Sequence, residues 1–173
     1  MTSLVLTVIG DDRTGLVSAL TSLVEVRGGS WQRSRMTRLA GKFAGVAEVE
    51  VPADAVDPLR TDLGRLAEDG LTVTVETSEQ PGAATRTLWR LHLLGQDRPG
   101  ILAEISTALA GHGVGIEELD TALTDAPMAG GRLFEVDALL TVPGATDEGR
   151  VRAELERLAD ELMVDLTVGG DEA

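Results

Sequence analysis

The sequence predicts an α+β protein made of two ferredoxin-like βαββαβ domains with antiparallel sheets. The first observation behind this prediction is an internal repeat, in which Gly10–Leu16 aligns with Gly95–Ile101 at an offset of 85 residues. The second is that apolar residues follow the same order of periods in both copies: strand, helix, strand, strand, helix, strand. The third is a polar segment between the copies, where the chain-breaking pair Pro81-Gly82 is typical of a linker.

The repeat extends through the length of both copies. Gly28 matches Gly113 at the same offset, whereas Phe43 matches Phe134 at an offset of 91 residues. The difference, 91 − 85 = 6 residues, is most simply an insertion in the second copy at the loop Asp125–Gly130. We therefore expect a first domain at residues 1–78, a linker at 79–86 and a second domain at 87–170.

Hydrophobic periodicity predicts each element in turn. Apolar side chains recur at helical spacing within residues 16–24, 56–66, 101–109 and 151–162. Short apolar or alternating segments predict strands at 4–9, 30–39, 42–51 and 71–76, and again at 88–94, 115–124, 132–142 and 163–168.

The ends of the first helix in each copy carry recognisable capping residues. Asp12 and Asp97 precede these helices and are candidate N-caps, and Pro99 suits a first helical turn because its missing N–H would have no partner there. Glycines at 28–29 and 111–113 suit the C-terminal ends, because glycine accepts a positive φ.

Composition excludes several classes of site. With no Cys and only His92 and His112, neither a thiolate site nor a three-histidine metal site can form. The 15 Lys and Arg against 29 Asp and Glu give a net charge of −14, which argues against direct contact with nucleic acid. No apolar run reaches the ~20 residues of a membrane span, and the first residues lack the basic start of a signal peptide. We expect a cytoplasmic protein with no membrane contact, no metal and no cofactor.

The turn between the first strand and the first helix is the most informative feature of each copy. Free backbone N–H groups and the positive end of the helix dipole at this point suit a carboxylate or another anion. Gly15 and Gly100 would let a ligand approach the main chain closely. The alternative interpretation is a plain strand-to-helix turn capped by Asp12 or Asp97.

Longer strings of residues support a resemblance to a known family. They are Ser30–Gly45 in the first copy, and Gly115–Thr121, Ala126–Gly130 and Leu133-Phe134 in the second. The repeated unit resembles the ACT domain, a small-ligand sensor that commonly binds amino acids. The whole chain, over about residues 3–168, resembles the tandem-ACT glycine cleavage system transcriptional repressor family.

This resemblance implies a non-enzymatic regulator that acts through a protein partner, a transcription factor, in response to glycine or a related amino acid. It also implies a ligand held at the first loop and helix start, against the beginning of the second strand, where family members often carry Asn. Ser30 and Gly115 stand at those positions here. The ligand-binding residues expected are Asp11, Asp12, Arg13, Thr14, Gly15, Leu16 and Ser30, and Gln96, Asp97, Arg98, Pro99, Gly100, Ile101, Leu102, Gly115 and Ile116.

A basic cluster in the first copy is the candidate partner-binding surface. Together with Lys42, the arginines Arg33, Arg35 and Arg38 could receive an acidic surface of a partner or nucleic acid, or they could form a solvated or ion-paired strand face against the many carboxylates. We also expect a homodimer. The alternative functions are a ligand-independent dimerisation or assembly module and an enzyme of small carbonyl or folate chemistry. The enzyme alternative is disfavoured because the two repeats leave no catalytic domain.

Overall fold

The structure is a computed structural model that describes residues 1–78, 86–125 and 131–170. The chain divides into two compact units at a boundary within residues 79–85. The predicted linker therefore lies outside the described residues except for Arg86, which already belongs to the second unit's first strand. Residues 126–130 of the predicted insertion also lie outside them.

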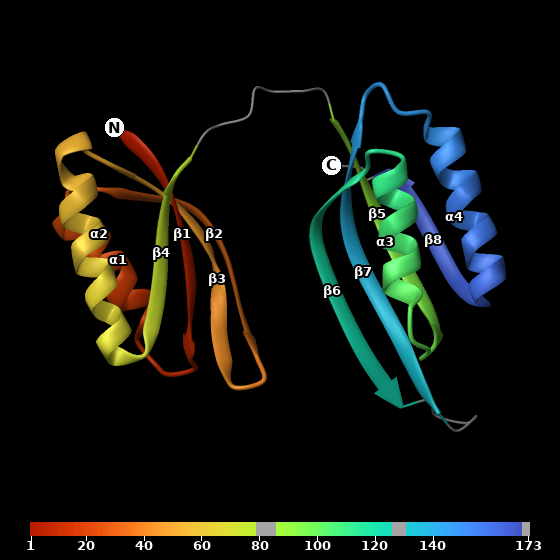
Figure 1. The fold of residues 1–173 in the computed structure, drawn as a ribbon, viewed down its shortest axis with the longest axis horizontal. Helices are drawn as coiled ribbons and strands as arrows, with labels where there is room; N and C mark the ends of the chain where they lie inside the picture. The colour runs from red at the N-terminus through yellow and green to blue at the C-terminus, as the bar shows by residue number, and fades with distance from the viewer. Residues whose placement is uncertain (79–85, 126–130, 171–173) are drawn as a thin grey trace. The chain divides into compact units, whose positions relative to one another are not determined.

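The first unit has the predicted βαββαβ order, with two helices on one face of a four-stranded antiparallel sheet (Figure 1). The order of strands across the sheet is β2-β3-β1-β4. Its elements are β1 Thr2–Asp11, α1 Leu16–Val26, β2 Ser30–Leu39, β3 Lys42–Val51, α2 Val56–Arg65 and β4 Leu71–Thr77, with short 3₁₀ helices at Ala53–Ala55 and Leu66–Asp69.

The second unit repeats this arrangement, with strand order β6-β7-β5-β8 (Figure 1). Its elements are β5 Arg86–Gln96, α3 Ile101–Gly111, β6 Gly115–Asp125, β7 Arg132–Pro143, α4 Glu148–Leu162 and β8 Val164–Gly170. The predicted fold class is confirmed in both units, and the strands extend one or two residues beyond several predicted bounds.

Each unit has its own core between the sheet and its helices. In the first, Leu4, Leu6 and Val8 alternate along β1 and pack against Leu20 of α1 and Leu59 of α2, all essentially without solvent contact. This alternation is why β1 presents one face to the helices. In the second, the corresponding strand residues are Trp89, Leu91 and Leu93, and the Arg152 guanidinium lies 5.1 Å from the Trp89 ring centroid.

The helix starts differ from the capping prediction, which was wrong. The N-caps are Gly15 and Gly100, with φ of 88° and 101°, and no side chain caps either helix. A residue with a Cβ rarely adopts this conformation, so glycine is required here to turn the strand into the helix. Pro99 accordingly lies before the cap and outside the first helical turn. At the far ends, Gly28 and Gly113 have positive φ as expected.

One strand bound was also wrong for a conformational reason. Met163 was expected to open the last strand, but it forms the C-cap of α4 with φ of 53°. Its N–H donates to the carbonyl oxygens of Ala159 and Asp160, so it closes the helix and β8 begins at Val164.

None of the helices in the described part of the chain is long and apolar enough to cross a membrane.

Candidate functional site

The start of α1 presents unpaired backbone donors to solvent. The first helical hydrogen bond runs from the N–H of Ala19 to the carbonyl oxygen of Gly15. The N–H groups of Leu16, Val17 and Ser18 therefore have no acceptor within the helix. These groups carry the positive end of the helix dipole, which favours an anion at this point.

A hollow of about 260 Å³ lies at this helix start. Two arginines border it, Arg13 from the loop and Arg38 from the end of β2, where Arg38 stands opposite the buried Phe43. Both guanidinium groups also interact with other parts of the first unit: Arg38 with the loop, and Arg13 with the turn before β4. Arg38 Nε lies 2.9 Å from Asp12 Oδ1, and Arg13 Nη2 donates to the carbonyl oxygen of Asp69 at 2.9 Å. The lining residues are Arg13, Gly15, Leu16, Val17, Ser18, Arg38 and Phe43.

Other predicted residues of this loop lie beside the hollow without lining it. Asp11 forms an ion pair with Lys42, its cross-strand neighbour, and the hydrogen bond from Lys42 lowers the pKa of the Asp11 carboxyl below its ordinary value. Asp12 is held through its N–H, which donates to the carbonyl oxygen of Gly41, and through Arg38. Thr14 is exposed in the loop. The loop thus contributes its main chain and Arg13 to the hollow, while its carboxylates pair with neighbouring cations.

The start of α3 has the same backbone geometry but different side chains. The first helical bond joins the N–H of Glu104 to the carbonyl oxygen of Gly100, which frees the N–H groups of Ile101 and Leu102. Leu123 stands opposite Phe134 in the register position that Arg38 holds opposite Phe43.

The charged residues of the second loop pair with neighbouring side chains, and one of these partners, Glu104, is an acidic residue in the first turn of α3 itself. Arg98 Nη2 lies 4.0 Å from Glu104 Oε1, and Asp97 is paired with Arg132 at 2.7 Å. Without a cation in the place of Arg38, the second helix start is less suited to a carboxylate than the first.

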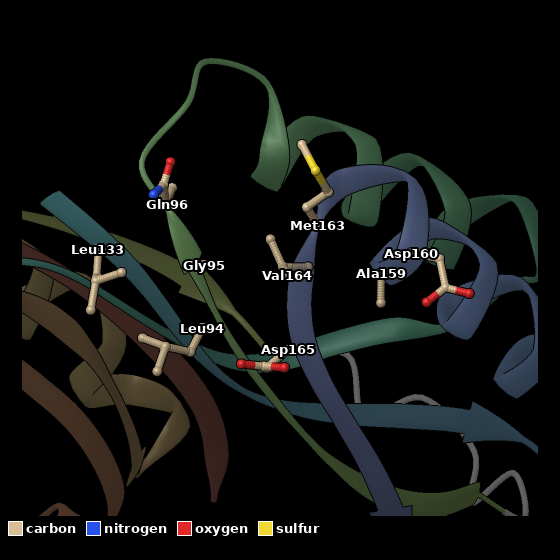
Figure 2. A pocket seen from close by; sticks show the side chains of 9 residues that line it. All are labelled: Leu94, Gly95, Gln96, Leu133, Ala159, Asp160, Met163, Val164 and Asp165. Carbon is tan, nitrogen blue, oxygen red and sulfur yellow. The ribbon is translucent and has the colours of Figure 1, made fainter. Parts of the chain in front are cut away.

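A larger hollow of about 440 Å³ opens on the other side of the second loop, towards the turn between α4 and β8 (Figure 2). Gln96 is the predicted site residue in its lining, and the carboxylates of Asp160 and Asp165 border it. The exposed side chain of Met163 projects beside it (Figure 2). In the first unit, Arg13 occupies the corresponding place: its side chain donates a hydrogen bond to the carbonyl oxygen of Asp69 in the turn before β4.

Strand register separates two predicted ligand residues from the loops of their own units. Ser30 stands level with Ser3 across β3, whereas the loop begins after Asp11, eight residues further along β1. At ~3.4 Å per residue the separation is about 27 Å. Gly115 stands level with Leu88 in the same way, eight residues from Gln96. Within one unit, the loop and the start of the second strand therefore do not line one pocket. Ile116 follows Gly115 on the edge strand, with its side chain partly exposed.

The predicted basic cluster does not form one surface. Arg33 and Arg35 lie opposite Glu48 and Val46, on the sheet face away from the helices, and Arg33 Nε pairs with Glu48 Oε2 at 2.7 Å. Arg38 lies on the helix-covered face and borders the hollow. The expectation of a single patch is wrong for Arg38.

Three residues that line the hollow were not predicted from the sequence: Val17, Ser18 and Phe43. The signal for the first two was present, because any helix leaves its first N–H groups free and these extend beyond Leu16. Phe43 reaches the site through the β2–β3 hairpin, which the Asp12–Gly41 hydrogen bond joins to the loop. That contact depends on strand pairing and gives no local sequence signal.

Comparison with known proteins assigns the family. The fold defines a tandem of α+β units with free helix N-termini beside their first loops. A sequence model of the ACT domain matches residues 2–77 and 91–169, and the chain belongs to the ACT domain family.

One curated relative matches part of the chain, and two solved structures share the fold over nearly its whole length. A UPF0237 protein of Methanopyrus kandleri is 38% identical over 78 residues, which cover 44% of this chain and 79% of that protein. The crystal structure of an unknown protein from Galdieria sulphuraria is 27% identical with a TM-score of 0.87, over 98% of both chains. A structure titled "putative glycine cleavage system transcriptional repressor" shares the fold at 17% identity and a TM-score of 0.76, over 99% and 98% of the two chains.

Proposed function

We propose that this protein is a non-enzymatic, amino-acid-responsive regulator whose first ACT unit binds the carboxylate of a small amino acid such as glycine. The observation that carries the proposal is the hollow at the start of α1, where Arg13 and Arg38 flank the free N–H groups of the first helical turn. Its volume of about 260 Å³ lies below the ~300–1,000 Å³ typical of pockets for drug-sized ligands, which suits a small molecule.

The chemistry of the lining favours a carboxylate over a cation. A carboxylate can accept from backbone N–H groups and from a guanidinium, and hydrogen bonds to charged groups contribute ~1.5–3 kcal/mol. The lining itself holds no acidic residue, so the ammonium group of an amino acid would point towards Asp12, which is paired with Arg38 at the rim.

The output of such a sensor is association with a protein partner. We propose a transcription factor as this partner, a cytoplasmic location and a homodimeric state. A ligand changes such an association only if its affinity differs between the free and the partner-bound states. The structural likeness to a glycine cleavage system repressor supports the fold of this regulator, and glycine remains the first ligand to test.

Calorimetric titration with glycine tests the proposal directly. We expect glycine to bind the wild-type protein and Arg38→Gln to weaken binding roughly 10- to 100-fold, which corresponds to losing ~1.5–3 kcal/mol. Arg33→Gln is the matched control, since it removes the same charge from the opposite face of the same strand. Acetate separates recognition of a carboxylate from recognition of an amino acid. No binding of any small amino acid at millimolar concentration, or equal effects of the two arginine variants, would contradict the proposal.

A second candidate function is a ligand-independent assembly module. The observation that favours it is the edge strand β6, where Ile116, Leu119 and Leu123 expose large apolar side chains on one face. Exposed apolar edges pair readily with another chain. The two functions are separable by sedimentation of the wild-type protein and Arg38→Gln, each with and without glycine. A sensor changes its oligomeric state with glycine in the wild type only, whereas an assembly module keeps its oligomeric state in all four conditions.

A further inference from the structure

Three potential metal-ligating side chains meet on the helix-free face of the second sheet. His92 of β5 lies directly opposite Asp137 of β7, and Glu135 lies two residues before Asp137 on the same face. His92 Nδ1 is 2.9 Å from Asp137 Oδ1, and His92 Nε2 is 4.0 Å from Glu135 Oε1. One potential ligand atom from each residue lies within 4.8 Å of those of the other two.

We propose that His92, Glu135 and Asp137 form a binding site for a divalent transition-metal ion of the Zn²⁺ type. Zn²⁺ takes imidazole nitrogen and carboxylate oxygen at ~2.0–2.2 Å in tetrahedral geometry, so neighbouring ligand atoms around one ion lie about 3.3–3.6 Å apart. His92 Nδ1 and Asp137 Oδ1 are at a hydrogen-bond distance of 2.9 Å, so the two side chains would separate by about 0.5 Å to admit the ion between them. Glu135 Oε1 lies nearest the other ring nitrogen, Nε2, so the Glu135 side chain, which is 38% exposed, has to rotate towards the Nδ1 side of the ring to become the third ligand.

The charge around these residues favours a cation. Asp120 of β6 lies directly opposite Asp137, and like charges in this position destabilise a sheet. The His92 imidazole lies within 4.0 Å of the carboxylates of both Glu135 and Asp137. Arg90 lies on the same face but opposite Leu139, one pair further along the sheet. A bound divalent ion would offset the repulsion among the carboxylates.

The exposure of the site defines what kind of metal centre it is. The side chains of His92, Glu135 and Asp137 are 43%, 38% and 63% exposed, so water completes the coordination shell. An imidazole ligand selects Zn²⁺ or Ni²⁺ over Mg²⁺ and Ca²⁺, which prefer all-oxygen shells. The site lies on the helix-free face of the second sheet, whereas the proposed amino-acid hollow lies at the start of α1 in the first unit, so the two proposals are independent.

The test of a Zn²⁺ site at His92 meets little interference from other ligands, because the chain has two histidines and no cysteine. Zn²⁺ is titrated calorimetrically into the full chain at ~0.15 M salt with excess Mg²⁺, which occupies weak carboxylate sites. We expect one site whose affinity falls at least tenfold in His92→Gln and is also weakened in Glu135→Gln and Asp137→Asn. His112→Gln is the matched control and should bind Zn²⁺ as the wild type does.

A second measurement excludes misfolding as the cause. The imidazole resonances of His92 should shift on adding Zn²⁺ while those of His112 stay in place, and circular dichroism of the metal-free variants should match the wild type. Arg38→Gln should keep full Zn²⁺ affinity, which separates this site from the amino-acid hollow. Equal Zn²⁺ affinity in His92→Gln and wild type, or a loss confined to His112→Gln, would overturn the proposal and leave His92 as a surface ion-pair partner.

Discussion

Arg13 donates a hydrogen bond from Nη2 to the backbone carbonyl oxygen of Asp69 at 2.9 Å, which joins the first loop to the turn before β4. Its counterpart in the repeat, Arg98, instead lies 4.0 Å from Glu104 on α3. In the first unit, Arg13 therefore connects the loop to the turn before the last strand. In the second unit, the corresponding arginine makes no such bond within the described residues, and a hollow lies beside Gln96 near the turn between α4 and β8. Because of this additional hydrogen bond, we expect the first loop to be the better ordered of the two.

Removing the Arg13 anchor should loosen the first loop. We expect Arg13→Ala to lower the free energy of unfolding by about 1 kcal/mol, because one hydrogen bond is lost, and to speed hydrogen exchange of the Asp12 amide, which pairs with Gly41. Arg98→Ala is the control, since a surface ion pair contributes only ~0–1 kcal/mol. Unchanged exchange at Asp12 in Arg13→Ala would show that the anchor does not order the loop.

The glycine at the start of α1 should be irreplaceable for a conformational reason. Gly15 has a φ of 88°, and no atom within 4 Å would obstruct a Cβ there. We expect Gly15→Ala to cost about 1–2 kcal/mol of unfolding free energy from backbone strain alone. Gly64→Ala is a matched control, because Gly64 lies in α2 with open space around it, and alanine there should stabilise by ~0.5–1 kcal/mol. Urea denaturation of both variants measures the contrast, and equal effects would contradict the strain argument.

The elements were predictable because the apolar periods of both copies are regular. Leu4, Leu6 and Val8 alternate as a half-buried strand must, and Val151, Leu155 and Leu158 repeat at helical spacing. The helix caps were not predictable in detail, because Asp12 and Asp97 fit the usual capping preference while the chain uses a left-handed glycine instead. Their carboxylates pair with Arg38 and Arg132, which are distant in sequence.

The site was only partly predictable because it depends on topology. The helix α1 has 11 residues and carries the chain about 16 Å back along the sheet, so β2 starts far from the loop that precedes α1. This places Ser30 at the opposite end of the sheet from Asp11. Glu135 and Asp137 were missed beside His92 because the strand pairing joins residues more than 40 positions apart.

The ion pair between Asp11 and Lys42 should be visible as a depressed pKa. Lys42 donates a hydrogen bond to the Asp11 carboxylate, and this bond, with the charge of Lys42, lowers the pKa of Asp11 in the folded protein. The pair therefore contributes to stability above the unfolded-state pKa, and the contribution is lost as the pH falls through the folded-state pKa. In Lys42→Gln the Asp11 pKa should rise towards its ordinary value, as followed by NMR titration of the carboxyl carbon. Glu154, whose pKa is lowered chiefly by a hydrogen bond from Arg157, should titrate identically in both proteins.

Gly95 should tolerate no side chain, because β5 packs closely against β8 at this point. A Cβ on Gly95 would lie 2.3 Å from Val164 Cγ1, so we expect Gly95→Ala to cost about 1–3 kcal/mol of unfolding free energy through overpacking. Gly169→Ala is the control on β8, where no atom lies within 4 Å of the added Cβ, and it should be neutral or stabilising. If the clash with Val164 is the cause, the double variant with Val164→Ala should lose at least ~0.5 kcal/mol less than the sum of the single variants. Additive losses in urea denaturation would place the strain elsewhere in the second unit.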